Sequence, residues 1–122
     1  MAVTRRSMIA AFALLPVIAV AGCRSHHVEV SVENRTGAEV RLLEVDYPNA
    51  SFGVDSLPPG ATYRYRIQVS GQGTVKVQYT DPANRQPQMT GPTLREDDQG
   101  GLDIVLEPDG KAEFHPQLVP PR

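Results

Sequence analysis

The sequence predicts an all-β fold, a small antiparallel sandwich of six to seven strands, for the part of the chain that follows residue 22. Polar and apolar residues alternate there with a period of two, which is the pattern of half-buried strands. The 122-residue chain has 11 prolines and 10 glycines, and all of them except Pro16 and Gly22 follow residue 22, most of them between the alternating runs, as turns require. Beyond residue 22 no run shows the 3.6-residue period of an amphipathic helix.

Residues 1–22 have the parts of an export signal helix. Arg5 and Arg6 form a positive start, residues 8–20 form an apolar run, and small residues follow. A helix that crosses a bilayer needs about 20 apolar residues, whereas this run is shorter and contains Pro16. We therefore expect the segment to be cleaved; a retained membrane helix is the weaker alternative.

The segment Val20-Ala21-Gly22-Cys23 resembles, position by position, the lipobox of bacterial lipoproteins. The resemblance implies that Val20, Ala21 and Gly22 are recognised by the signal peptidase, which cuts before Cys23. It also implies a thioether link between the Cys23 sulfur and a diacylglycerol, with the new amino group often acylated. Two or three acyl chains hold a protein on a membrane far more durably than one. An ordinary cleaved signal without lipid is the alternative.

Two further resemblances concern export and sorting. The stretch around Arg5 and Arg6, with Thr4 before the pair and apolar residues after it, is similar to the twin-arginine export motif. General secretory export is the alternative, since many signals contain two arginines. Arg24 stands where an aspartate tends to imply retention in the inner membrane. In a cell with two membranes this implies the periplasmic face of the outer membrane.

The first strands follow directly. Residues 27–33 alternate without interruption and end at a turn over residues 34–37. Residues 39–47 form the next strand, and its apolar parity changes between Leu42 and Leu43, which predicts a bulge or a crossing between sheets. A short edge strand is expected at residues 51–54, before a proline-rich turn at residues 57–60.

The second half is less regular. Residues 63–69 and 75–79 read as two antiparallel strands joined by a tight hairpin at residues 70–73. Residues 81–101 lack periodicity and read as a long loop, which Met89 and Leu94 could attach to the sheet as a short irregular strand. Residues 102–106 and 111–114 form a last hairpin.

This spacing of strands and turns favours a sandwich of the immunoglobulin or transthyretin-like type. The turn into the strand at residues 57–63 resembles that of carboxypeptidase regulatory-like domains, which share this architecture. The expected organisation is a signal peptide at residues 1–22, a lipidated tether at 23–27, the sandwich at 28–115 and a loosely held, proline-rich tail at 116–122.

Composition restricts the partners. The chain has 12 basic and 14 acidic side chains, and two of the basic ones lie in the leader, so the remainder is mildly acidic. It has no clustered basic face, which argues against a nucleic-acid partner. The 6% aromatic content and the absence of tryptophan give no sign of a sugar-stacking platform.

The candidates for metal binding are few. His26 and His27 are adjacent, so on an extended chain they point to opposite sides, and a site would need His115 or a carboxylate as well. We interpret the pair as part of a solvated spacer. Residues 96–98 are Glu96-Asp97-Asp98, with Asp103 nearby, but they lack the alternating spacing of a calcium loop. Cys23, once a thioether, can be neither a metal ligand nor a nucleophile.

No catalytic constellation is visible, since no histidine lies between His27 and His115 and no glycine-rich loop precedes a helix. We therefore expect a non-catalytic protein without a cofactor other than the lipid on Cys23. The expected function is a lipid-anchored structural or protein-interaction module of the cell envelope. The alternative is a ligand- or metal-binding lipoprotein that uses His26, His27, His115 and the acidic residues 96–98. The partner and the oligomeric state are left open.

Overall fold

The structure is a computed structural model that describes residues 26–119. The leader with Arg5 and Arg6, the lipobox at residues 20–23 and the end of the tail at residues 120–122 lie outside the described residues. No helix within residues 26–119 is long and apolar enough to span a membrane.

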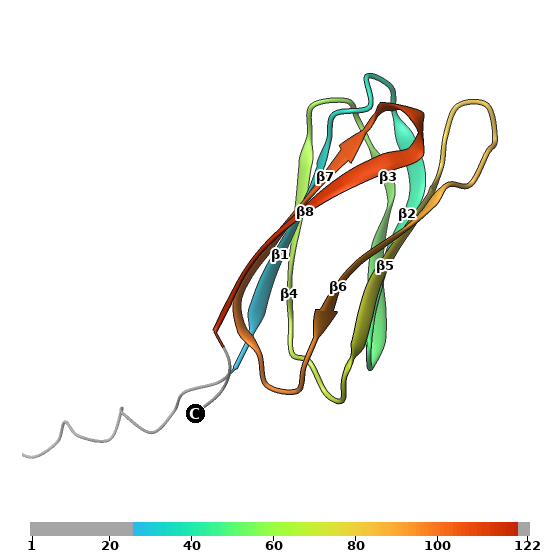
Figure 1. Ribbon diagram of the computed structural model, residues 1–122. Coiled ribbons are helices and arrows are strands. Elements are labelled where there is room, and N and C mark those ends of the chain that lie inside the picture. The colour runs from blue at the N-terminus through green and yellow to red at the C-terminus, as the bar shows by residue number, and fades with distance from the viewer. Residues whose placement is uncertain (1–25, 120–122) are drawn as a thin grey trace, which may run out of the picture.

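Eight strands form two four-stranded sheets that pack face to face (Figure 1). The first sheet contains, in spatial order, β4 (Thr62–Ile67), β1 (Val28–Asn34), β7 (Gln99–Glu107) and β8 (Lys111–Val119). The second sheet contains, in spatial order, β3 (Ala50–Leu57), β2 (Val40–Tyr47), β5 (Gly73–Thr80) and β6 (Gln88–Leu94). The predicted all-β sandwich is thereby confirmed, with eight strands instead of the six to seven expected and with one parallel pair, β1 and β7.

The core between the sheets is built mainly from aliphatic side chains that the alternation pointed inward. Val28, Val30 and Val32 of β1 are buried, and so are Leu102 and Ile104 of β7 beside them. Each such side chain contributes about 1.5–3 kcal/mol when it leaves water. The period-two pattern in the sequence therefore indicates which face of each strand packs against the other sheet.

The pairing of strands is antiparallel except between β1 and β7, which run parallel. The first strand and the penultimate strand thus lie side by side in the middle of one sheet. Only a long connection can join parallel neighbours, and here all the strands from β2 to β6 lie between them in the chain. Strand periodicity contains no information on this pairing.

The predicted irregularity at Leu42 and Leu43 is a bulge. The register between β2 and β5 shifts between Arg41 and Glu44, and Leu42 has a φ of 52° and an exposed side chain. Across the bulge on β3, Gly53 has no Cβ, and an added Cβ would clash with the carbonyl oxygen of Leu43. The change of parity therefore keeps both Val40 and Leu43 in the core.

The predicted hairpin at residues 70–73 is wrong. β4 belongs to the first sheet and β5 to the second, so the segment between them crosses from one sheet to the other. The strand periodicity was correct, but two alternating runs joined by a short glycine-containing turn can either pair or separate. The turn after β1 crosses in the same way, since β2 lies in the second sheet.

Two further expectations are corrected. The long loop expected at residues 81–101 is wrong, and the short strand expected there at Met89 and Leu94 is confirmed: β6 pairs with β5 and buries Leu94, so the loop before it is residues 81–87. Gly91 and Pro92 conceal this strand in the sequence. The sandwich also extends past residue 115, because β8 continues through Pro116 to Val119. An edge strand tolerates a proline, since one side of its ladder needs no donor.

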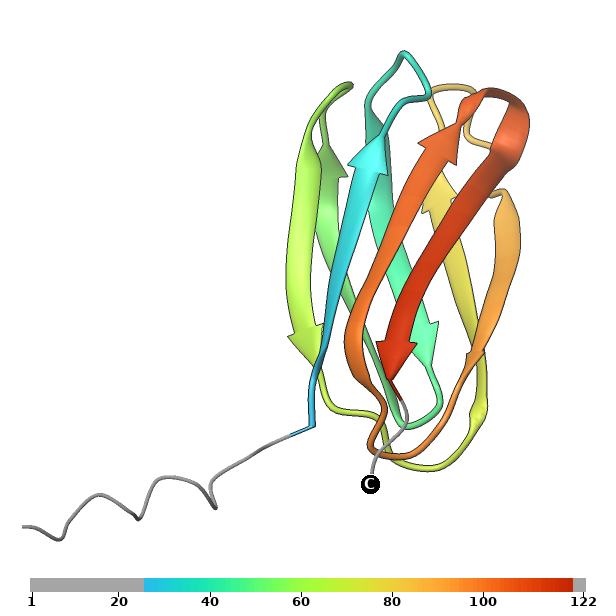
Figure 2. The same cartoon turned by 60° about the vertical axis from the view of Figure 1, so that its left-hand side comes forward.

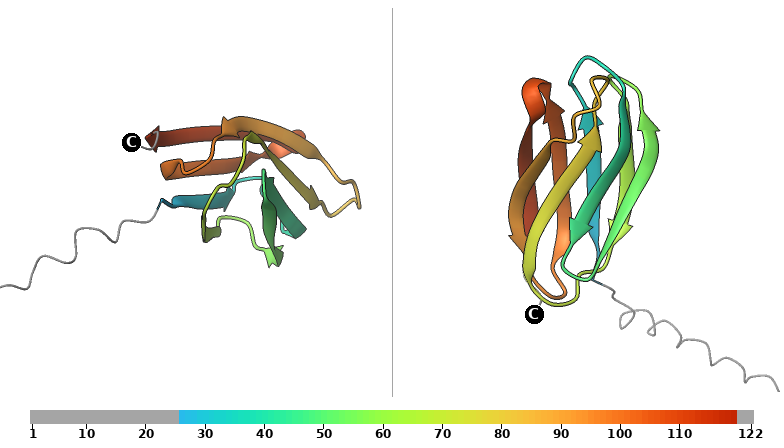
Figure 3. Two further views of the ribbon diagram at one scale, coloured as in Figure 1. Left: turned by 90° about the horizontal axis from the view of Figure 1, so that it is seen from below. Right: turned by 90° about the vertical axis from the view of Figure 1, so that its right-hand side faces the viewer.

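The two ends of the sandwich differ. The described chain starts and stops at one end, which we call the proximal end and which also contains the turns at residues 48–49, 68–72 and 95–98 (Figure 1). The opposite, distal end contains the loops at residues 35–39, 58–61, 81–87 and 108–110, as the right-hand view of Figure 3 also shows.

Candidate functional site

The histidines predicted as possible ligands are not brought together. The carbonyl oxygen of His27 accepts a hydrogen bond from the backbone nitrogen of Gly100 at 3.1 Å, at the proximal end. His115 lies opposite Asp103, three residues further along β7, which is about 10 Å at 3.3 Å per residue. Within residues 26–119 no group of three or more His, Cys, Asp or Glu side chains lies close enough to hold a metal ion.

The acidic residues 96–98 form the turn between β6 and β7. The Asp98 carboxylate, which is buried, accepts a hydrogen bond from the backbone nitrogen of Arg95 at 2.8 Å. Glu96 accepts one from the backbone nitrogen of Gly71 at 3.3 Å, and so ties this turn to the crossing between β4 and β5. Two of the three carboxylates therefore stabilise the turns of the proximal end, Asp98 within the β6–β7 turn and Glu96 between that turn and the β4–β5 crossing.

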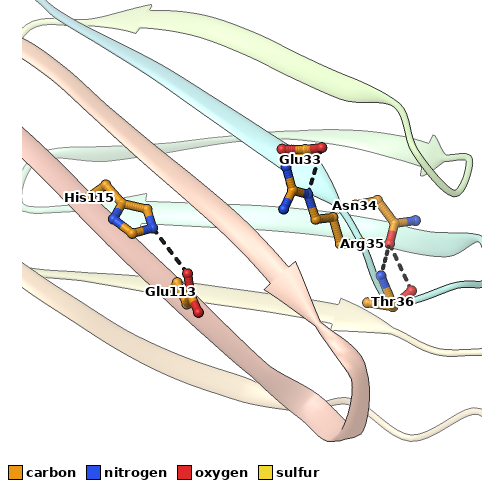
Figure 4. Close-up of polar contacts among 6 residues, drawn as sticks. All are labelled: Glu33, Asn34, Arg35, Thr36, Glu113 and His115. Atoms are coloured by element: carbon orange, nitrogen blue, oxygen red, sulfur yellow. Dashed lines mark hydrogen bonds and ion pairs between the residues drawn. The ribbon is translucent and has the colours of Figure 1, made fainter.

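The outer face of the first sheet has a row of polar side chains around a shallow recess of about 280 Å³. Ser31 donates a hydrogen bond to Asp103 at 2.6 Å, with Arg64 on one side and His115 on the other. The His115 ring lies 3.2 Å from Glu113, as Figure 4 shows. The Ser31 hydroxyl is thus bonded to Asp103, whereas His115 is next to Glu113.

The larger concavity, about 590 Å³, lies at the distal end. It is lined by Thr36 and Ala38 of the β1–β2 loop, by the β5–β6 loop from Asp81 to Pro87, and by the turn at Pro108–Gly110. Val40 and Tyr79 line it from strands of the second sheet. Loops that are distant in the sequence and come from both sheets therefore meet in one surface.

The β5–β6 loop is held by the carboxylate of Asp81. One of its oxygens accepts hydrogen bonds from the backbone nitrogens of Ala83 and Arg85, both at 2.9 Å. The other oxygen accepts from Nε of Arg85 at 2.9 Å. These bonds, the backbone bond of Arg85 first among them, lower the pKa of Asp81 below its ordinary value. The loop is thus closed by its own contacts.

The β1–β2 loop is held by Asn34, which is fully buried. Its amide nitrogen donates to the carbonyl oxygens of Ala38 at 2.8 Å and Leu57 at 2.9 Å. Its amide oxygen accepts from the backbone nitrogen and the hydroxyl of Thr36 at 2.9 and 2.7 Å, as Figure 4 shows. One side chain therefore joins the loop to the end of β3.

The chemistry of the concavity suits binding. Burial raises the pKa of Tyr79, whose side chain is 3% exposed, so its phenol stays neutral at ordinary pH. Pro82, Pro87 and Pro108 add rigid apolar surface, while Asp81 and Arg85 add charge. Sequence reasoning missed this surface, because it depends on the folding of three loops toward one another. Asn34 and Asp81 were visible only as turn-forming residues.

Comparisons with known proteins give the fold alone. No family model matches the chain, and no curated protein matches it. Among solved structures, an NMR structure of a protein from Eubacterium rectale is similar, with a TM-score of 0.57 and 11% sequence identity. The similarity covers 74% of this chain and 87% of that one. At this identity the likeness supports the sandwich architecture and assigns no activity.

We expect Asp81 to make stability depend on pH. Its pKa is lower in the folded state, so its contribution is present above the unfolded pKa of about 4 and is lost as pH falls through the folded value. Urea unfolding of the wild type and Asp81→Asn between neutral and acidic pH measures this. The wild type should be the more stable at neutral pH, and the difference should vanish in acid. A difference that is the same at every pH would contradict the assignment.

Proposed function

We propose that this chain is a lipid-anchored protein of the cell envelope, without catalytic activity, that presents its distal end to a protein partner. One observation carries the proposal: the described chain begins at the proximal end, whereas the larger concavity lies at the distal end. With lipid on Cys23, three residues before His26, the proximal end would face the membrane. The concavity would then face away from it.

The dimensions are compatible with this arrangement. Residues 23–27 span at most about 17 Å when extended, so the tether keeps the sandwich close to the bilayer. β1 has 7 residues, which corresponds to about 23 Å along the sandwich. The distal loops would therefore be presented above the headgroups, where a partner in the same compartment could reach them. In a cell with two membranes we place the protein on the periplasmic face of the outer membrane.

The distal surface is also suited to binding because it is formed in advance. Asp81 closes one of its loops and Asn34 another, so little backbone freedom remains to be lost when a partner binds.

The metal-binding alternative has less support. His27 and His115 lie at different levels of the first sheet. Glu96 and Asp98, which could have added oxygen ligands, accept backbone hydrogen bonds instead. We therefore favour the interaction module.

We expect the mature N-terminal peptide to start at lipid-modified Cys23. Mass spectrometry of the purified protein measures this directly, and fractionation of cells that produce Cys23→Ala gives the companion result. The variant should leave the membrane fraction, because it lacks the acyl chains that hold the protein there. An unmodified thiol at Cys23 in the mature protein would overturn the anchor.

We expect the partner to contact the distal end. A photo-crosslinking amino acid at Gln86, which lines the concavity, should capture a reproducible envelope protein in living cells. The matched control places the same amino acid at Asp97, in the turn at the proximal end. Equal capture from both positions, or none from Gln86, would contradict the assignment of the distal end. Neither outcome affects the test of the anchor.

A further inference from the structure

We propose that the edge strand β4 binds an extended peptide strand in which acidic and apolar side chains alternate. The peptide would add to the first sheet as a fifth strand, through main-chain hydrogen bonds to the open side of β4. This surface lies along the side of the sandwich, apart from the distal concavity, and the inference does not depend on the lipid anchor.

β4 is an edge strand without a proline. Among residues 26–119 it pairs with β1 alone, and Figure 2 shows it (yellow-green) at the outer margin of the sandwich. The edge strands β6 and β8 on the other side contain Pro92 and Pro116, and they contact each other where Gly91 faces the ring of Phe114. Proline and coverage are devices that stop a strand from joining an edge. β4 has no proline, and its contacts with β3 across the sandwich are about as few as those between β6 and β8.

Aromatic side chains gather between β4 and the adjacent edge of the second sheet. Tyr65 of β4 is 45% exposed, and its ring stacks on that of Phe52 of β3 at 4.8 Å. Tyr47 and Tyr63 lie 6.3 and 6.2 Å from the same ring. We call these four residues the aromatic edge. Apolar side chains of an added strand would cover Tyr65 and remove its exposed surface from water, which is the favourable term of binding.

The other face of β4 is basic. Arg64 and Arg66 alternate with Tyr63 and Tyr65 along the strand. Arg66 is bonded to Glu29 at 2.5 Å, whereas Arg64 has no ion-pair partner among residues 26–119. A strand beside β4 places every second side chain next to these arginines and the others next to the tyrosines. Acidic residues in the first set and apolar residues in the second therefore match both faces.

The same alternation disfavours pairing with a second copy of this chain through β4. Two β4 strands side by side would bring the arginines of one copy against those of the other on the same face. Like charges directly across a strand pair are destabilising. A one-residue slip would instead place arginine beside tyrosine and expose apolar groups to water. β4 therefore favours an acidic strand from another protein and disfavours pairing with β4 of a second copy.

The test uses the full chain in detergent micelles and two capped, fluorescent peptides, one alternating glutamate with valine and the other alternating lysine with valine. We expect the glutamate peptide to bind at least about tenfold more tightly in fluorescence polarisation. Hydrogen exchange of the β4 backbone amides should slow when it is bound. Equal binding of both peptides, no binding, or protection that appears on β8 instead of β4 would overturn the proposal.

Charge reversal supplies the matched comparison. Arg64→Glu should reverse the preference toward the lysine peptide, whereas Lys111→Glu, at the opposite edge of the same sheet, should leave it unchanged. Both residues are exposed, and the hydrogen-exchange pattern of the core strands verifies that each variant is folded. If both variants show the same loss of affinity for the glutamate peptide, net charge and not β4 explains the binding, and the proposal fails.

Discussion

The side chain and backbone of the buried residue Asn34 together make hydrogen bonds to three separate parts of the chain, and the distal end takes its shape from them. Its side chain reaches Thr36, Ala38 and Leu57. Its backbone nitrogen donates to Ala61 at 2.9 Å, and its carbonyl oxygen accepts from Gly60 at 2.7 Å, so the β3–β4 loop is tied to the same point. Each buried polar atom left without a partner would cost about 1–3 kcal/mol, which is why a single arrangement of these loops is favoured.

The two ends of the sandwich and its two sides differ in structure, and we assign them different roles. The distal end is a preformed surface with a concavity. At the proximal end, where the described chain starts and stops, Asp98 bonds within the β6–β7 turn and Glu96 joins that turn to the crossing between β4 and β5. On one side the edge strands β6 and β8 contain prolines. On the other side the edge strand β4 has no proline and contributes to the aromatic edge. The lipid proposed at Cys23 would select which of these surfaces faces the membrane.

Much of the fold could be predicted from periodicity, because a strand with one buried face has an apolar residue at every second position. The alternation of β1 and the parity change at Leu42 were interpreted correctly for this reason. Pairing could not be predicted, since nothing in residues 70–73 distinguishes a hairpin from a crossing between sheets. β6 was expected only as a short irregular strand at Met89 and Leu94, because Gly91, which makes room for Phe114, and Pro92 interrupt its pattern. The distal concavity was missed because it exists only where the β1–β2 loop, the β5–β6 loop and the turn at residues 108–110 meet in the folded chain.

Urea unfolding of Asn34→Ala against Asn49→Ala tests most directly whether this buried amide organises the fold. Asn49 makes the same kinds of bond, to Gln68 and Ser70, but at an exposed position of the proximal end. We expect Asn34→Ala to lose about 2–4 kcal/mol of unfolding free energy, because buried carbonyl oxygens lose their donor, and Asn49→Ala to lose about 1 kcal/mol or less. Equal losses, or a loss below about 0.5 kcal/mol for Asn34→Ala, would contradict the organising role of Asn34.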